Sequence, residues 1–411
     1  MLARILFSIS AFVFISSVSL HAESVSLELT AQAAGRDVPV VFELPKSLAK
    51  TTWFRLERVQ GDKDELVPSQ LIPGDAPSLA WMVRGDLAKG DKRTYRLSYG
   101  DAAAPRVGSA PTVQCLDNGA SLEYSYDGRR ITRFNYAVVP APKGTDPAYD
   151  RSGYLFPIWN ASGQVVANDF PGNHKHHHGI WFPWTNTTFE GKKVDFWNSG
   201  KKEGRIEVTK LASHGGGGVF GHFRSKQRFL DLKPKGDGKQ KTVLEESWDV
   251  RVWARTEQFL FDLESIQYNV TDAPLLLHKY RYGGLGFRGS GKWEGHGDNC
   301  RFLTSEGKTR KDGHATRSRW CAVWGLLDGK PTGVAVLCHP KNFRFPQHMR
   351  IHPSEPFFNY APVQGGDFEI VKGKPYTSRY RFVVFEGEPS AELCESWWES
   401  YAKPPQVRVL P

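Results

Sequence analysis

Apolar and polar positions alternate over short stretches of this chain, which is the period of β-strands and not that of helices. Residues 25–29 read Val-Ser-Leu-Glu-Leu, and residues 93–99 read Arg-Thr-Tyr-Arg-Leu-Ser-Tyr. Similar segments, with Gly, Pro, Asn and Asp between them, recur at residues 38–44, 121–126, 243–254, 259–270, 319–327, 333–339 and 378–385. Strands at this spacing without helical segments between them predict an all-β fold with a large antiparallel sandwich.

One helix and one domain boundary stand out from this pattern. Residues 390–401 have helical character, with a serine N-cap, a proline before it and another proline beyond the end. Residues 101–111 are rich in Ala, Gly and Pro, which is typical of a linker. We therefore expect a small N-terminal β-sandwich at residues 23–105 and a large β-sandwich at residues 112–405.

The first 22 residues have the layout of a secretion signal. Arg4 gives a short positive start, residues 5–18 are apolar, and Leu20-His21-Ala22 resembles a cleavage site. We therefore expect residues 1–22 to be removed and the mature protein to act in the periplasm or outside the cell. The sequence contains no later apolar run of about 18 residues, so we expect the mature chain to have no transmembrane segment.

The composition of the 411-residue chain is that of a globular protein, with 40% hydrophobic and 24% charged residues. The formal net charge of +10 favours an acidic partner. Because export separates the protein from nucleic acid, we expect a carbohydrate partner, with anionic carbohydrates among the candidates, and no nucleic acid. An aromatic content of 13% supplies ring faces on which sugars stack. The five cysteines permit at most two disulfides, and their spacing does not decide the pairing.

The densest candidate chemistry lies in residues 169–182, Asp-Phe-Pro-Gly-Asn-His-Lys-His-His-His-Gly-Ile-Trp-Phe. Four of the 13 histidines fall within five positions, at His174, His176, His177 and His178. If the segment is extended, the first, second and fourth of them share one face and His177 points to the other. Imidazole titrates near neutral pH, so all four are candidate catalytic acid–base groups.

Two other interpretations of these histidines stay open. His176 and His178 could bind one divalent metal ion, with a third ligand from elsewhere, for example His278, His296 or His339. Alternatively, the imidazoles only form hydrogen bonds with the backbone at the end of a strand. The cofactor is therefore undetermined, and a divalent metal is one candidate.

Aromatic and charged residues near the histidines complete a candidate carbohydrate site. Trp181 and Trp197 are candidate stacking platforms, and Asp195 is a candidate acceptor for sugar hydroxyls. The remaining candidates for binding substrate, above all its anionic groups, are Arg281, Arg288, Arg350, His339 and His348. If residues 348–352 are extended, His348, Arg350 and His352 share a face.

Two further motifs admit simpler interpretations. Residues 284–289 match GxGxxG and residues 286–292 nearly match a phosphate-binding loop, but Trp293 replaces the expected Ser or Thr and no helix follows. Asp262 and Glu264 share one face of an expected strand and are the carboxylate pair that glycoside hydrolysis would need. They are equally typical of charges on a solvent-exposed strand face.

Several of these segments together resemble a known family. They are Asp169-Phe170-Pro171, the block from His174 to Trp181, Val194-Asp195-Phe196-Trp197, Gly283 to Arg288, and His339-Pro340. This set resembles a family of exported bacterial proteins labelled methane oxygenase PmoA-like, and that label implies a metal-dependent oxygenase. The strand order and residues 380–387 are also similar to the galactose-mutarotase-like supersandwich of sugar epimerases and polysaccharide lyases, which implies a β-supersandwich for the large domain.

These observations predict an exported carbohydrate-active enzyme that acts on a sugar or oligosaccharide, with acidic sugars among the candidates. Proton transfer by histidine, as in a lyase or an epimerase, fits imidazole and guanidinium groups better than hydrolysis does. Assistance by a metal stays open. The alternatives are a carbohydrate-binding protein without turnover and a metal-dependent oxygenase.

Overall fold

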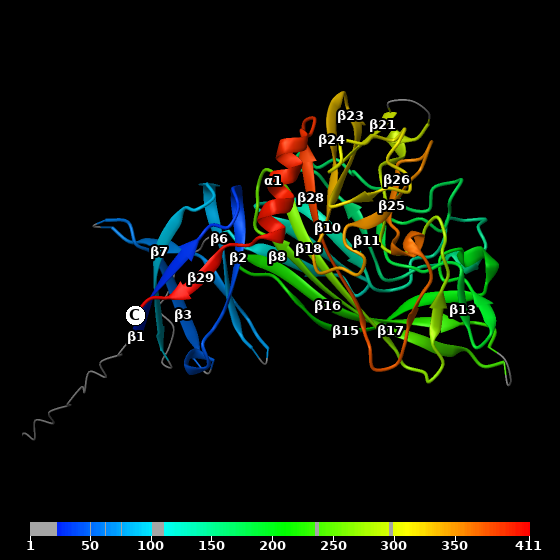
Figure 1. The fold of residues 1–411 in the computed structure, drawn as a ribbon, viewed down its shortest axis with the longest axis horizontal. Helices are drawn as coiled ribbons and strands as arrows, with labels where there is room; N and C mark the ends of the chain where they lie inside the picture. The colour runs from blue at the N-terminus through cyan, green and yellow to red at the C-terminus, as the bar shows by residue number, and fades with distance from the viewer. Residues whose placement is uncertain are drawn as a thin grey trace, which may run out of the picture.

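The computed structural model of the chain describes residues 23–49, 51–61, 63–74, 76–100, 111–234, 238–295 and 299–411. Antiparallel sheets dominate this part of the chain, which contains one α-helix (Figure 1). The predicted all-β fold, a large antiparallel sandwich preceded by a small β-sandwich, is confirmed. The expected secretion signal at residues 1–22 lies outside the described residues.

The small sandwich consists of two sheets. The five-stranded sheet has the order β29 (Gln406–Val409), β1 (Glu23–Thr30), β7 (Lys92–Gly100), β3 (Trp53–Arg58) and β4 (Glu65–Val67). The three-stranded sheet has the order β2 (Gly35–Glu43), β6 (Ser78–Leu87) and β5 (Ser69–Ile72).

The large sandwich consists of two long sheets and a smaller one. The nine-stranded sheet has the order β22 (Arg317–Ser318), β25 (Gln347–Ile351), β26 (Phe357–Tyr360), β20 (Gly286–Arg288), β12 (Ile180–Trp181), β11 (Tyr154–Ile158), β10 (Arg129–Asn135), β9 (Ser121–Tyr126) and β8 (Val113–Asp117). The eight-stranded sheet has the order β15 (Gly204–Gly215), β16 (Phe220–Asp231), β17 (Lys241–Trp253), β18 (Phe259–Asn269), β28 (Tyr376–Glu386), β24 (Lys330–Cys338), β23 (Trp320–Leu327) and β21 (Cys300–Thr304). The four-stranded sheet has the order β14 (Lys192–Val194), β13 (Thr187–Phe189), β19 (Leu275–Leu277) and β27 (Phe368–Ile370). Short 3-10 turns occur at η1 (Lys46–Leu48), η2 (Pro147–Tyr149), η3 (Ser199–Lys201), η4 (Gly291–Trp293) and η6 (Pro362–Gly365).

The main hydrophobic core lies between the nine-stranded and the eight-stranded sheets. Phe134 of β10 stacks on Phe223 of β16 with ring centroids 4.1 Å apart. Tyr360 of β26 stacks on Tyr380 of β28 at 5.5 Å. All four side chains are completely buried. Each such burial contributes about 1.5–3 kcal/mol, so these aromatic contacts hold the two long sheets together.

The helix α1 (Ala391–Ala402) covers the seam between the two sandwiches (Figure 1). Ser390 Oγ accepts a hydrogen bond from the Leu393 N–H at 3.1 Å, which confirms the expected N-cap. Trp397 and Trp398 pack in one cluster with Met82 of β6 and with side chains of the eight-stranded sheet. Within the described residues, no helix is long and apolar enough to cross a membrane.

The chain returns to the small sandwich after α1. Strand β29 pairs antiparallel with β1, with Val407 opposite Leu29 and Val409 opposite Leu27. The first and last described strands therefore lie side by side, coloured red and blue in Figure 1. Residues 406–409 belong to the sheet of the small sandwich, which the sequence pattern did not predict.

The five cysteines are free thiols in this fold. Four of them, all except Cys115, are buried. Burial raises the pKa of Cys300 and of Cys338 to about 12, so both carry unreactive thiols. The stability of the described part of the chain rests on packing and hydrogen bonds and not on disulfides.

A polar cluster interrupts the apolar core. Glu246 is 2% exposed and accepts hydrogen bonds from Ser265 Oγ at 2.5 Å and from Gln267 Nε2 at 3.0 Å. Gln267 Oε1 accepts from Trp184 Nε1 at 2.6 Å. Burial raises the pKa of Glu246 to about 7, and the two hydrogen bonds offset only part of that rise.

We expect the substitution Glu246→Gln to change how stability depends on pH. The unfolded chain releases the Glu246 proton near pH 4.3, whereas the folded protein holds it up to about pH 7. Between these two pH values, the folded state therefore binds one more proton than the unfolded state. The stability of the wild-type protein therefore falls by roughly 2–3 kcal/mol between pH 5 and pH 8. The variant has an uncharged side chain of the same shape, so its stability does not show this fall. Urea unfolding of both proteins at pH 5 and pH 8 measures this difference.

The matched control is Glu245→Gln, which changes an exposed neighbour on the same strand. It should leave the pH dependence of the wild-type protein unchanged. An identical pH dependence for wild type and Glu246→Gln would contradict the prediction.

Candidate functional site

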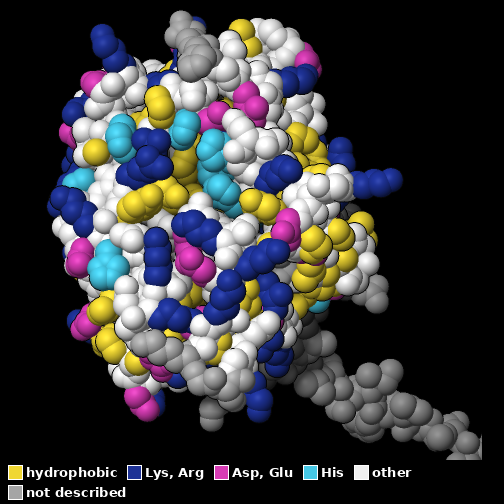
Figure 2. All heavy atoms as spheres, turned by 90° about the vertical axis from the view of Figure 1, so that its right-hand side faces the viewer, with side chains coloured by type: hydrophobic (Ala, Val, Ile, Leu, Met, Phe, Trp, Pro, Cys, Tyr) yellow, Lys and Arg dark blue, Asp and Glu magenta, His cyan; other side chains and the backbone are white. Residues whose placement is uncertain are grey.

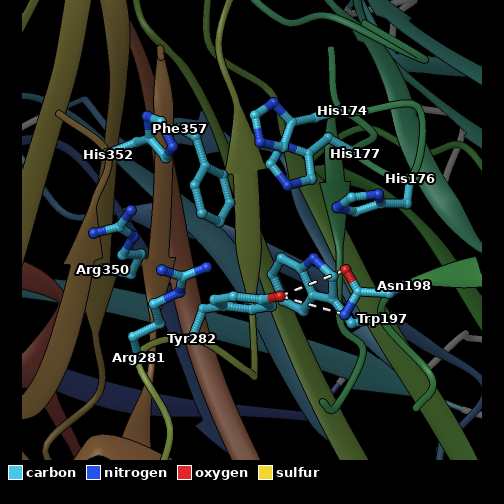
Figure 3. A pocket seen from close by; sticks show the side chains of 10 residues that line it. All are labelled: His174, His176, His177, Trp197, Asn198, Arg281, Tyr282, Arg350, His352 and Phe357. Atoms are coloured by element: carbon cyan, nitrogen blue, oxygen red, sulfur yellow. Dashed lines mark hydrogen bonds between the residues drawn. The ribbon is translucent and has the colours of Figure 1, made fainter. Parts of the chain in front are cut away.

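A pocket of about 220 Å³ opens on the face shown in Figure 2, where histidine and basic side chains surround a hydrophobic hollow. The histidine segment, the loop after β14, the segment before β20 and strands β25 and β26 supply its walls (Figure 3). The lining residues are His174, His176, His177, Trp197, Asn198, Arg281, Tyr282, Arg350, His352 and Phe357. The volume is below the roughly 300–1,000 Å³ of a drug-sized site, so it admits one small unit of a ligand.

The histidine segment forms two consecutive turns and not a strand. The His174 N–H donates to the Pro171 carbonyl at 3.0 Å, and the His177 N–H donates to the His174 carbonyl at 2.8 Å. These turns break the alternation expected for an extended segment, because each one redirects the chain. The first three of the four histidines therefore line the pocket, and His178 does not.

The three histidines form a compact group against an aromatic floor. The rings of His174 and His177 stack at 4.8 Å, and His176 meets His177 edge-on at 4.8 Å. His177 rests on Phe357 at 4.4 Å and on Trp181 at 5.1 Å. Figure 3 shows the three imidazoles on one side of the pocket, with Phe357 beside them.

His178 belongs to a buried pair and not to the pocket, which corrects its predicted catalytic and metal-binding roles. Its Nδ1 lies 2.6 Å from Asp169 Oδ1, and Tyr154 donates to Asp169 Oδ2 at 2.8 Å. Burial lowers the pKa of His178, and Asp169 offsets part of that shift. The neutral imidazole donates its Nδ1–H to the carboxylate, which anchors the end of the histidine segment.

Two guanidinium groups occupy the wall opposite the histidines. Arg281 and Arg350 both line the pocket, and Figure 3 shows them on the side of His352. Among the residues that the structure describes, neither guanidinium has a carboxylate partner. The guanidinium of Arg281 lies 5.8 Å from the ring of Tyr280 and 5.6 Å from the ring of Tyr282. The predicted location of Arg281 and Arg350 at the site agrees with this geometry.

Arg288 lies behind the pocket, which corrects its predicted contact with substrate. Its guanidinium is completely buried and donates to Glu294 and to Glu355, each at 2.6 Å. Its Nη1 is also 3.4 Å from His177 Nδ1. Glu355 in turn accepts from Asn173 Nδ2 at 2.5 Å. Arg288 and Glu355 therefore connect β20 to the histidine turns and to the segment after β25.

The same segment fixes the tautomer of His352. Its Nδ1 accepts backbone hydrogen bonds from Ser354 at 3.3 Å and from Glu355 at 3.1 Å. An acceptor at Nδ1 leaves the proton of the neutral ring on Nε2. Burial lowers the pKa of His352 to about 4, and Arg350 adds to that shift.

Asp195 holds a wall of the pocket from behind, which corrects its predicted contact with sugar hydroxyls. The carboxylate is completely buried. It accepts hydrogen bonds from the backbone N–H groups of Trp197 and Asn198, each at 3.0 Å, and from Lys201 Nζ at 2.7 Å. Asn198 Nδ2 donates to Asp195 at 2.7 Å and to the Tyr282 hydroxyl at 3.3 Å. Asp195 thereby places Trp197 and Asn198 at the pocket.

The pocket is cationic at its rim and neutral at its imidazoles. Burial lowers the pKa of His176 to about 3 and the pKa values of His174 and His177 below their ordinary range. Repulsion among the imidazoles and from Arg288 adds to these shifts. All are neutral at pH 7, so the pocket offers neutral nitrogens beside two permanent positive charges.

Three other predicted site residues lie elsewhere. Trp181 is fully buried beneath His177, where it supports the base of the pocket, and it is not an exposed stacking platform. His339 packs on Tyr401 with ring centroids 5.2 Å apart. His348 lines a neighbouring hollow.

The possible carboxylate pair for hydrolysis is also outside the pocket. Asp262 pairs with Arg381 at 2.6 Å, and Glu264 pairs with Arg379. Both carboxylates face a cross-strand arginine of β28, as charges on the outer face of a sheet do.

The residues present do not fit a metal centre. Across the described ranges, no group of three or more His, Cys, Asp or Glu side chains is placed to hold a metal ion. The suggested third ligands do not change this: His278 lies 2.8 Å from Thr188 Oγ1, His339 lies against Tyr401, and His296 is outside the described residues. We derive no step through a metal.

Four pocket residues were not among the sequence candidates. Asn198 follows the Val-Asp-Phe-Trp motif, Tyr282 lies beside Arg281, and Phe357 lies on β26. His352 directly follows β25 and lines the pocket with Arg350, two positions earlier, and this alternation was the signal that could have identified it. Nothing in the sequence pattern indicates Phe357, because an apolar residue in a strand is usually core.

Comparisons with known proteins show one family relationship. A family model described as "Family of unknown function (DUF6807)" matches residues 121–399, which include the whole pocket. A comparison with curated proteins found no match.

Two solved structures resemble this chain at 12% identity and a TM-score of 0.43. They are described as a protein in the glycosyl hydrolase family 38 and as an alpha-mannosidase, both from Enterococcus faecalis. Each match covers 94% of this chain, which spans about half of theirs, 47% and 46%. Likenesses at this score assign no activity.

We expect Glu355→Ala to destabilise the protein by about 3 kcal/mol, since it removes a carboxylate from a completely buried guanidinium. It also removes the acceptor of Asn173 Nδ2, whereas the backbone hydrogen bond from residue 355 to His352 remains. Urea unfolding measures the loss. The control Glu388→Ala breaks an exposed ion pair with Arg301, in which the two charged groups are 2.9 Å apart. It should lower the free energy of unfolding by less than about 1 kcal/mol. Equal losses would show that Arg288 does not depend on Glu355.

Proposed function

We propose that this protein, which belongs to the family DUF6807, binds an acidic sugar unit in the histidine pocket and transfers a proton next to its acidic group. The observation that carries this proposal is the pair of guanidinium groups, Arg281 and Arg350, without a carboxylate partner in the described part of the chain. The proposed activity is that of a carbohydrate lyase or epimerase.

The charges of the pocket support an anionic ligand. Arg281 is exposed and Arg350 is half-buried, and no Asp or Glu side chain of the described residues lines the small pocket that they share. Burial lowers the pKa of Arg350 and repulsion from Arg281 adds to that shift, so an anion beside both groups is favourable. Guanidinium binds carboxylate or sulfate by two parallel hydrogen bonds, each stronger than a neutral one.

The other walls suit a sugar ring. The half-buried ring of Tyr282 lines the pocket together with Trp197 and Phe357, which are 2% and 3% exposed. An aromatic lining of this kind suits the apolar C–H face of a sugar. Asn198 and the Tyr282 hydroxyl supply polar groups at the rim, and Figure 3 shows their hydrogen bonds to one another. A few polar groups within an aromatic hollow are typical of small-molecule sites.

A neutral imidazole is the candidate base. His176 lines the pocket and has no hydrogen bond among the described residues, so its ring nitrogens are available to a ligand. It takes the proton from the carbon next to the carboxylate, and the electron pair moves onto the carboxylate, whose charge Arg281 and Arg350 stabilise. Return of a proton to the opposite face gives an epimer. Departure of the neighbouring ring substituent with its electron pair gives an unsaturated sugar.

A bound anion also raises the low pKa values of these imidazoles. The pKa of His176 is about 3 in the unliganded pocket because of burial and nearby positive charge. A bound carboxylate adds negative charge and raises that pKa, so the base strengthens when the substrate arrives. The proposed setting outside the cytosol, from residues 1–22, gives access to extracellular acidic polysaccharides.

The second candidate function is binding without turnover. The low pKa of His176 favours it, since a base with a pKa near 3 is poorly matched to neutral pH unless the ligand raises it. In that case the imidazoles only form hydrogen bonds with sugar hydroxyls.

The proposal is tested by incubating the protein with glucuronate, galacturonate and mannuronate sugars and their oligomers. Calorimetry follows binding, and mass spectrometry and ultraviolet absorbance follow epimers and unsaturated products. We expect Arg350→Gln to weaken uronate binding about 10- to 100-fold, because one charge-assisted contact is lost. We expect His176→Gln to bind within about threefold of wild type and to lose turnover by at least about 100-fold.

Arg301→Gln is the control, because it removes an arginine from an exposed ion pair remote from the pocket residues. It should change neither quantity. Binding without any product in the wild-type protein would select the second candidate function, and the absence of binding to every acidic sugar would overturn the proposed function.

Affinity for a uronate should rise as the pH falls from 7 to 5. The imidazoles are neutral in the empty pocket, with pKa values of about 3 for His176 and about 4 for His352, and a bound anion raises them. Binding therefore takes up protons, and lower pH favours the complex while the sugar carboxylate stays ionised. Calorimetry at pH 5, 6 and 7 measures the change, with a neutral sugar as control. An affinity independent of pH would exclude this coupling.

A further inference from the structure

The histidine pocket adjoins a second hollow of about 580 Å³. Arg281 lines both spaces. The other polar side chains of the second hollow include Lys279, His314, His348 and Gln364. The two spaces are therefore neighbours on either side of one guanidinium.

Strand β25 runs along both hollows. His348, Arg350 and His352 share one face of this strand and its extension, as the alternation in the sequence predicts. His348 lines the second hollow, whereas Arg350 and His352 line the first. Side chains two residues apart on a strand are spaced by about 7 Å, so the strand presents one polar side chain after another along a continuous path.

The second hollow is also one-sided in charge. Lys279 and Arg281 line it together with two histidines, and no carboxylate does. Asp367 lies beside it but accepts from the Lys279 N–H at 2.6 Å and faces His278 at 3.2 Å. Other hollows of the described chain are mixed, since Asp146 and Lys202 line one of them and Glu245 and Lys226 another.

Two polar atoms of this hollow have no hydrogen-bond partner. Gln364 Nε2 donates to the Arg281 carbonyl at 2.8 Å and to the Met349 carbonyl at 3.1 Å, which fixes the amide. Its Oε1 is then a buried acceptor without a donor, and His348 Nδ1 is likewise buried and unpartnered. An unsatisfied buried polar atom costs about 1–3 kcal/mol, but these two atoms have almost no accessible surface and are not counted as ligand contacts.

We propose that the second hollow is a subsite for the next unit of an acidic oligosaccharide, so that the ligand is an oligomer with repeated anionic groups. The inference rests on the proposed function of the histidine pocket. Arg281 lies between the two units, and Lys279 and His348 bind the anionic group of the second unit. The anionic group is a carboxylate or a sulfate, which share this recognition chemistry.

The test compares chain lengths by calorimetry with the whole protein. The probes are galacturonate, digalacturonate and trigalacturonate, their glucuronate and mannuronate counterparts, and sulfated galactose oligomers of the same lengths. We expect a disaccharide of the preferred acid to bind at least about tenfold tighter than the monosaccharide. The double substitution Lys279→Gln and His348→Gln should reduce this ratio to below about threefold.

Lys372→Gln is the matched control, since it removes an exposed lysine that pairs with Asp272 at 2.8 Å. It should leave the ratio of the wild-type protein unchanged. Equal affinity for monomer and dimer, or an unchanged ratio in the double variant, overturns the second subsite while the proposed function stands. If no acidic monomer or oligomer binds, the proposed function itself fails. Preference for the uronate or the sulfated series identifies the anion.

Discussion

The completely buried guanidinium of Arg288 is the group on which the arrangement of the pocket depends. A charge removed from water is tolerated only when it is paired and hydrogen-bonded. Glu294 and Glu355 provide that pairing at 2.6 Å each, and Glu355 also binds Asn173 beside the histidine turns. Because the backbone of Glu355 donates to His352, one buried ion cluster sets both the imidazole wall and the wall opposite.

The contrast between paired and unpaired cations separates structure from function here. Arg288 is bound by two carboxylates and is completely buried, whereas Arg281 and Arg350 line the pocket without a carboxylate in the described part of the chain. Asp195 follows the same logic, since it accepts four hydrogen bonds, all from Trp197, Asn198 and Lys201. Charged residues near a site are thus informative only after their partners are counted.

The sequence predicted what local periodicity controls. Alternation identified the strands and the shared face of His348, Arg350 and His352, and the capping pattern identified α1. It failed in the histidine segment, where turns at His174 and His177 replace the expected strand. Pairing partners such as Glu355 for Arg288, which are 67 residues apart, depend on how distant segments meet, and no periodicity encodes them. The pairing of β29 with β1 is non-local for the same reason.

That last pairing has a consequence for the edge of the five-stranded sheet. Strand β1 needs β29 on one side, although about 380 residues separate them, as the bond between Arg408 and Glu28 illustrates. Without β29, the eight-residue strand β1 would be the edge of this sheet; with it, the edge is the four-residue strand β29. Exposed edges invite pairing with other chains, and a shorter edge strand offers fewer free backbone groups for such pairing.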